Sequence, residues 1–169
     1  MIARIFHKLA LSILLSFVIA TCHASGDIFV DNKAELTTTI KEGTSVRVVI
    51  QKMAIASGYP ITSGFLWGGD DAELPKTLVV SVQVWIDNEK IFVPMSSYSD
   101  LGNPRTASLK KIRKGFEIKI GGGDAAGGYS ATLSIENSNV RRRKVVSGEF
   151  PDQVWEETIY SFIPRNSNM

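Results

Sequence analysis

The fold is decided by one stretch of alternating residues, Leu78-Val79-Val80-Ser81-Val82-Gln83-Val84-Trp85-Ile86. Its even-numbered residues are all apolar, whereas Ser81, Gln83 and Trp85 occupy odd-numbered positions. Side chains alternate between the two faces of an extended chain, so a period of two indicates a strand with one buried face. We therefore predict a long half-buried strand here, with Leu78, Val80, Val82, Val84 and Ile86 turned towards the core.

The same period of two continues along most of the chain, and no window shows the spacing of an amphipathic helix. Asp87-Asn88-Glu89-Lys90 supplies turn residues before a short apolar run, which predicts a hairpin closed at Pro94. Further strands are predicted at 45–55, 116–120, 129–135, 140–146 and 157–162. Residues 25–44 carry six charges and little periodicity, so they form either an edge strand with a turn or a linker.

Short turns without intervening helices favour antiparallel pairing, and half-buried strands need a second apolar layer to cover them. An all-β antiparallel β-sandwich meets both demands, and a small closed β-barrel is the alternative. We favour the sandwich because residues 58–75 and 94–107 are long enough to cross between two sheets. The sandwich domain is predicted to cover residues 45–169.

The first 24 residues have the layout of a secretory signal peptide. Arg4 and Lys8 precede an apolar run, Leu9 to Ala20, and small residues follow up to Ala24. The run is shorter than the roughly 20 residues of a membrane-spanning helix, which favours cleavage and a secreted or periplasmic mature protein with no transmembrane span. Ile19-Ala20-Thr21-Cys22 resembles the lipobox of bacterial lipoproteins, although Thr21 departs from it, and this resemblance implies a lipid on Cys22.

Removal of this segment narrows the possible chemistry. Both histidines, His7 and His23, and the single cysteine, Cys22, lie within it. A mature chain without imidazole or thiol lacks the usual ligands of zinc, copper and haem, and it lacks the base of Ser-His-Asp and Cys-His catalysis. We therefore expect no metal and no cofactor.

The charge balance of the mature chain gives no general attraction to polyanions. The signal segment holds two of the nineteen Lys and Arg residues and none of the seventeen acids, so seventeen of each remain. Nucleic acid is accordingly not an expected partner.

The loop 64–73 is the segment most typical of a binding site. It combines flexible glycines with Phe65, Leu66 and Trp67, and with the acids Asp70 and Asp71. Aromatic residues dominate binding hot spots, so we predict that these five residues contact a partner. The competing interpretation is that the apolar residues plug an open end of the sandwich. A calcium site is disfavoured because the acids match no known loop spacing.

Two basic clusters could form an anion-binding patch if the fold brought them together: Lys110, Lys111 and Arg113, and then Arg141, Arg142 and Arg143. Consecutive charges on a strand point to both faces, which a buried strand does not readily accept. We therefore interpret residues 141–144 as a solvated sheet edge or end, where charges prevent unwanted pairing. Further along, Pro151 sets a turn before Trp155, an aromatic side chain that the fold must cover.

These features predict a small exported β domain that binds a protein partner or a cell-envelope component and is not catalytic. A carboxylate-dependent glycan hydrolase is the first alternative, with its acids drawn from Asp124, Glu149, Asp152, Glu156 and Glu157. A structural envelope protein, with or without a lipid tether, is the second. Two partly buried carboxylates in a cleft would favour the hydrolase, and an exposed aromatic patch without them would favour the binding domain.

Overall fold

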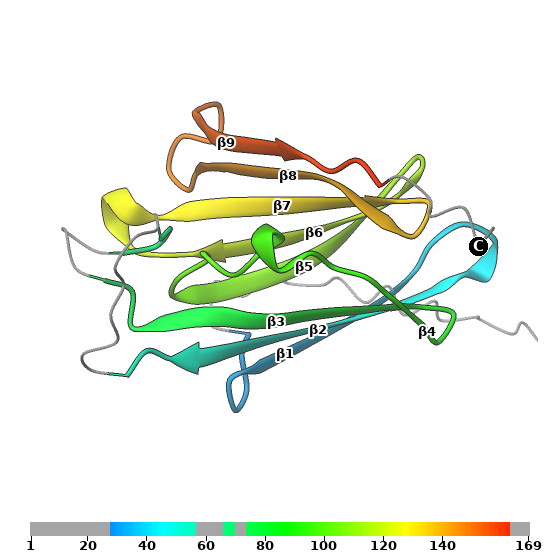
Figure 1. Ribbon diagram of the computed structural model, residues 1–169, viewed down its shortest axis with the longest axis horizontal. Coiled ribbons are helices and arrows are strands. Elements are labelled where there is room, and N and C mark those ends of the chain that lie inside the picture. The colour runs from blue at the N-terminus through cyan, green and yellow to red at the C-terminus, as the bar shows by residue number, and fades with distance from the viewer. Residues whose placement is uncertain (1–27, 57–65, 70–73, 163–169) are drawn as a thin grey trace, which may run out of the picture.

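The computed structural model describes residues 28–56, 66–69 and 74–162, and these form two antiparallel sheets. The first sheet contains β1 (Lys33–Thr39), β2 (Ser45–Ala54), β3 (Thr77–Ile86) and β4 (Glu89–Ile91). The second contains β5 (Pro104–Ile112), β6 (Gly115–Gly122), β7 (Tyr129–Glu136), β8 (Asn139–Ser147) and β9 (Val154–Ile159). Three short 3₁₀ turns complete the described elements: η1 (Lys41–Gly43), η2 (Met95–Ser97) and η3 (Ala125–Gly127). The predicted all-β antiparallel sandwich is confirmed, and the two sheets do not close into a barrel (Figure 1).

Within each sheet, every strand pairs with its neighbours in the sequence, so both sheets are meanders. The chain passes from one sheet to the other between β4 and β5, and this connection carries η2 across the front of the sandwich in Figure 1. The predicted crossing at 94–107 is therefore confirmed, although its last four residues already belong to β5. The crossing predicted at 58–75 is wrong, because β2 and β3 are paired in the same sheet.

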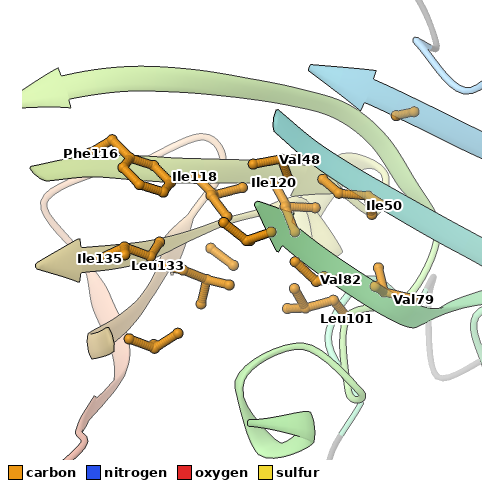
Figure 2. Packing of buried hydrophobic residues seen from close by; sticks show 14 of the residues in the cluster. Val48, Ile50, Val79, Val82, Leu101, Phe116, Ile118, Ile120, Leu133 and Ile135 are labelled. Carbon is orange, nitrogen blue, oxygen red and sulfur yellow. The ribbon is translucent and has the colours of Figure 1, made fainter. Parts of the chain in front are cut away.

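The core lies between the two sheets. Phe116, Ile118 and Ile120 of β6 face the side chains of Val48 and Val82 from the other sheet, and all are almost completely buried (Figure 2). The crossing connection adds Leu101, which is fully buried at the margin of the core. Burial of these side chains provides most of the free energy that holds the two layers together.

A bulge in β3 changes the direction in which Val80 points from the one predicted. Opposite β2, Ser81 pairs with Gln51 and Val79 pairs with Lys52, so Val80 is an extra residue without a partner. Beyond this extra residue the side-chain alternation is shifted by one position. Val79 is therefore buried, with 1% exposed, whereas Val80 is 43% exposed instead of facing the core as predicted.

A second bulge, in β8, decides where the basic residues point. Val140 pairs with Ile135 and Arg142 with Ser134, which leaves Arg141 as the extra residue. Because of this shift Arg143 takes an inward position and is buried. The prediction that 141–144 lies at a sheet edge or end is wrong, since β8 is flanked by β7 and β9 and these residues lie within the strand. The positive charge of Arg143 can be buried in this strand because two carboxylates pair with it.

Both ends of the domain differ in detail from the prediction. Residues 33–39, in the segment for which an edge strand or a linker was predicted, form the edge strand β1. The last strand spans 154–159 and not 157–162. It too contains a bulge, since Val146 pairs with Val154 and Val145 with Glu156, so that Trp155 is the extra residue.

Candidate binding site

Arg143 is the centre of a buried ion cluster at the side of the sandwich that the crossing connection covers. Its Nη2 donates to both oxygens of Asp100 at 2.7 Å, and its Nη1 donates to Glu156 Oε1 at 2.7 Å. Asp100 lies in the crossing connection and Glu156 in β9. Arg143 Nη1 also reaches the Ser96 carbonyl at 3.5 Å. One side chain of β8 therefore fastens the connection and the edge strand to each other.

Burial dominates the electrostatics of this cluster. The pKa of Asp100 is raised from its ordinary value because desolvation outweighs the opposing effect of the Arg143 guanidinium. Nearby, the Tyr129 hydroxyl is buried and has no hydrogen-bond partner among the described residues. Its pKa is raised as well, first by burial and then by the negative charge of Asp100. In this low-dielectric site, the positive charge of Arg143 stabilises the negative charges of the two carboxylates.

Two tryptophans stack beside the ion cluster. The rings of Trp67 and Trp155 are 5.2 Å apart between centroids and inclined by only 12°. The Trp67 indole N–H donates to Glu156 Oε2 at 3.4 Å, and its main-chain N–H donates to the Asp100 carbonyl at 2.9 Å. Asp100 and Glu156 therefore bind both Arg143 and Trp67.

The stacked rings line an open groove of about 610 Å³ at one end of the sandwich. The remaining lining consists of Leu66, Val154 and Ala126, together with the glycines at 68, 69 and 127. In Figure 1 the segment 66–69 and η3 lie at this end, away from β4. Apolar side chains and main-chain amides form this surface, which suits an apolar group better than a charged one.

Gly68 is required by the geometry of this groove. Its φ is +83°, in the left-handed region that favours glycine. A Cβ at this position would lie 2.4 Å from the Gly102 carbonyl oxygen and 2.8 Å from Cε1 of Tyr129. The close approach brings the Trp67 loop against the crossing connection and leaves the groove open next to it.

A second groove, of about 520 Å³, contains two carboxylates. Asp124 and Glu149 line it with Arg105, Thr106 and the main chain of several glycines. Arg105 lies 3.8 Å from Asp124 Oδ1, and the Asp124 side chain is 72% exposed. Asp100 and Glu156 line neither this groove nor the first one among the residues that the structure describes. Their oxygens face the Arg143 guanidinium.

The structure places two of the five predicted partner-binding residues in one groove. Leu66 and Trp67 line it, whereas Phe65, Asp70 and Asp71 lie outside the described residues. Trp155, which the sequence predicted only as a residue to be covered, is the missing half of the site. Its contact with Trp67 joins positions 88 apart in the chain, and no local pattern indicates such a pairing.

The six basic residues of the predicted anion patch do not form one surface. Lys110 and Arg142 share a row on the outer face of the second sheet, but β6 and β7 separate them by roughly 14 Å at the usual strand spacing. Glu117 stands between them in that row, and Arg142 is paired with Glu157 at 2.8 Å. Of the others, Lys111 and Arg113 are exposed, Arg141 is half-buried and Arg143 is buried.

Within the described residues no three His, Cys, Asp or Glu side chains are grouped as metal ligands would be. None of the helical turns in this part of the chain has the length and apolar character needed to cross a membrane. No protein-family model matches the chain, and it has no significant match among curated proteins or solved structures.

Proposed function

We propose that this protein is a small exported binding domain, without catalytic activity, that recognises a protein partner through the groove lined by Trp67 and Trp155. The observation that carries the proposal is the parallel stack of these rings in an open groove at one end of a rigid sandwich. Tryptophan is among the residues most enriched in binding hot spots, because it buries a large apolar area while losing little conformational freedom.

The surroundings of the stack support this role by holding it in one arrangement. Hydrogen bonds to Glu156 and Asp100 orient Trp67, and Arg143 fixes both of these residues. A site that is already ordered before binding avoids the entropy cost of ordering it on contact. Arg143 is therefore proposed to act on recognition through the tryptophans, without touching the partner itself.

The described lining favours a protein partner over a sugar. Recognition of a sugar needs polar side chains that pair with its hydroxyls, whereas Leu66, Val154 and Ala126 offer apolar contact. Val154 is 48% exposed beside the stack, so an incoming apolar side chain would bury its surface as well. A leucine or aromatic side chain of a partner fits this chemistry.

Affinity recovery of partners from the cell-envelope fraction tests the proposal. The native chain is compared with Trp155→Ala, and with Val154→Ser as a milder change in the same groove. Phe92→Ala is the matched control, because this ring is 69% exposed in the segment after β4, towards the other end of the sandwich. Loss of a partner with both groove variants and its retention with Phe92→Ala is the expected result. Equal recovery by all four proteins would contradict the proposal.

The exported state is a separate part of the proposal and rests on the first 24 residues. Mass spectrometry of the protein isolated from its native cell measures the N-terminus directly. Cleavage between residues 20 and 25 is expected, and a cut at Cys22 with added lipid mass would identify the tethered form. An intact Met1 on the accumulated protein would contradict export.

A carboxylate-dependent glycan hydrolase is the second candidate, because Asp124 and Glu149 line one groove. Such enzymes need one acid held in a buried environment, and the Asp124 side chain is 72% exposed. The discriminating assay measures release of reducing sugar from envelope glycans by the native chain and by Asp124→Asn. Turnover by the native chain that disappears in Asp124→Asn would establish the hydrolase and remove our first choice.

A further inference from the structure

We propose that the partner enters as an extended peptide segment, which adds a strand to the free edge of β9 and places an apolar side chain in the groove of Trp67 and Trp155. This inference rests on the proposed function and specifies the form of the partner. Strand addition of this kind uses main-chain hydrogen bonds for affinity and side-chain pockets for specificity.

The hydrogen-bond pattern of β9 shows which main-chain groups are available. The Tyr160 N–H donates to the Arg141 carbonyl, and Thr158 stands opposite Arg143 in the same ladder. Alternate residues of an antiparallel strand direct their N–H and C=O groups to opposite sides. Thr158 and Tyr160 therefore face β8, and Glu157 and Ile159 direct two donors and two acceptors away from it. Figure 1 shows β9 at the border of its sheet, with β8 on one side only.

Among the four edges of the described sheets, β9 is the one without positive charge or proline. β1 carries Lys33 and is bound into ion pairs, and β4 is only three residues long. β5 begins with Pro104 and carries Lys110 and Lys111. Such features normally protect a sheet edge from pairing with another chain. The sequence of β9, Val-Trp-Glu-Glu-Thr-Ile, has no proline and no positive charge. Its two acids pair with arginines of β8, and its bulge at Trp155 lies before the outward groups of Glu157 and Ile159.

The free edge runs directly into the groove. Val154 and Trp155 are the first two residues of β9, and both line the groove. At the other end of the strand Ile159 is 66% exposed. A peptide strand paired along 155–159 would therefore have main-chain partners at one end of β9 and the stacked rings at the other. An extended peptide offers this combination of evenly spaced main-chain groups and a projecting side chain.

Two symmetric registers of a second copy of this chain fit the same edge poorly. In a symmetric pairing centred on Glu157 the two Glu157 carboxylates would stand opposite each other, which is unfavourable. A pairing centred on Thr158 would place Ser161 opposite Trp155, so that a hydroxyl and not an apolar side chain would approach the groove. The next residue, Phe162, already packs edge-on against Phe92 at 6.2 Å.

A proline substitution tests the contribution of the main-chain N–H groups that point away from β8. Ile159→Pro removes an N–H that the β8–β9 ladder does not use, and proline is tolerated at such edge positions. Ile159→Ala removes most of the same side chain but keeps the donor, so the difference between the two variants reports on the main chain alone. Glu157→Pro and Glu157→Ala form a second matched pair. Circular dichroism verifies that each variant retains the sheet structure.

The probe is a phage library of random decapeptides selected on the native chain. Enriched peptides are expected to bind Ile159→Pro about tenfold more weakly than Ile159→Ala, as loss of one main-chain hydrogen bond with an unpaired partner group predicts. They are also expected to bind Trp155→Ala weakly. Equal binding to the proline and alanine variants, or no enrichment at all, would overturn strand addition.

The same variants separate this inference from the proposed function. Peptides that depend on Trp155 but not on the Ile159 donor would leave groove recognition standing and remove strand addition. Peptides that depend on the donor but not on Trp155 would place binding at the edge and contradict the groove. Sedimentation of the native chain completes the design, because a dimer that Ile159→Pro dissociates would show that a second copy occupies the edge and overturn the peptide partner.

Discussion

The guanidinium of Arg143 binds both carboxylate oxygens of Asp100, which lies in the connection that joins the two sheets, at 2.7 Å. The same guanidinium binds Glu156 of β9, so the crossing connection and the last two strands meet on one buried side chain. Nη2 holds Asp100 and Nη1 holds Glu156, so one planar guanidinium fixes the positions of two carboxylates relative to each other.

Replacement of Arg143 by methionine is expected to lower the free energy of unfolding by about 3 kcal/mol, because it leaves two partly buried carboxylates without their counter-charge. Urea unfolding at neutral pH measures the change. Arg142→Met is the control, since the ion pair of Arg142 with Glu157 is exposed and contributes less than about 1 kcal/mol. A similar small effect for both variants would show that the buried cluster does not stabilise the fold.

Asp100 is expected to make the stability depend on pH in a direction unusual for an acid. Burial raises its pKa above the ordinary 3.8, so the folded chain holds this proton to higher pH than the unfolded chain does. Its contribution is therefore complete below 3.8 and is lost as the pH rises through the raised pKa. The free energy of unfolding of the native chain minus that of Asp100→Asn should fall across this range, and a rise would contradict the assignment.

Glu35 is expected to behave in the opposite way. Hydrogen bonds from Arg47, at 2.6 Å, and from Lys33 hold its pKa at about 2, below the ordinary 4.5. The stabilisation is therefore present above 4.5 and disappears as the pH falls towards 2. Urea unfolding of the native chain and Glu35→Gln should show a difference at neutral pH that shrinks through this interval. A difference that stays constant down to pH 2 would count against these ion pairs.

The two-sheet architecture could be predicted from the sequence because most strands keep an alternation of apolar and polar residues. Phe116, Ile118 and Ile120 alternate without interruption, and all three are buried as the pattern predicts. β5 was missed because its alternating positions are largely polar and its first residue, Pro104, is typical of a loop.

The predictions of side-chain direction in β3 and β8 failed at bulges. One extra residue reverses every side chain beyond it, and nothing in the local composition marks Val80 or Arg141 as that residue. The burial of Arg143 follows from such a shift, so the ion cluster was invisible in the sequence. Two residues of the candidate groove, Leu66 and Trp67, were predicted, but the Trp155 contact depends on tertiary packing.

The three tryptophans allow the most direct test of groove recognition. Trp67 and Trp155 form the stack, whereas Trp85 lies in β3 beneath Arg47, 4.5 Å from the guanidinium carbon to the ring centroid, and serves as an internal control. The measurement follows the three indole N–H signals by NMR while the recovered partner, or a selected decapeptide, is added. Recognition through the groove predicts shifts for Trp67 and Trp155 with Trp85 unchanged. Binding that moves Trp85 alone, or none of the three, would contradict it.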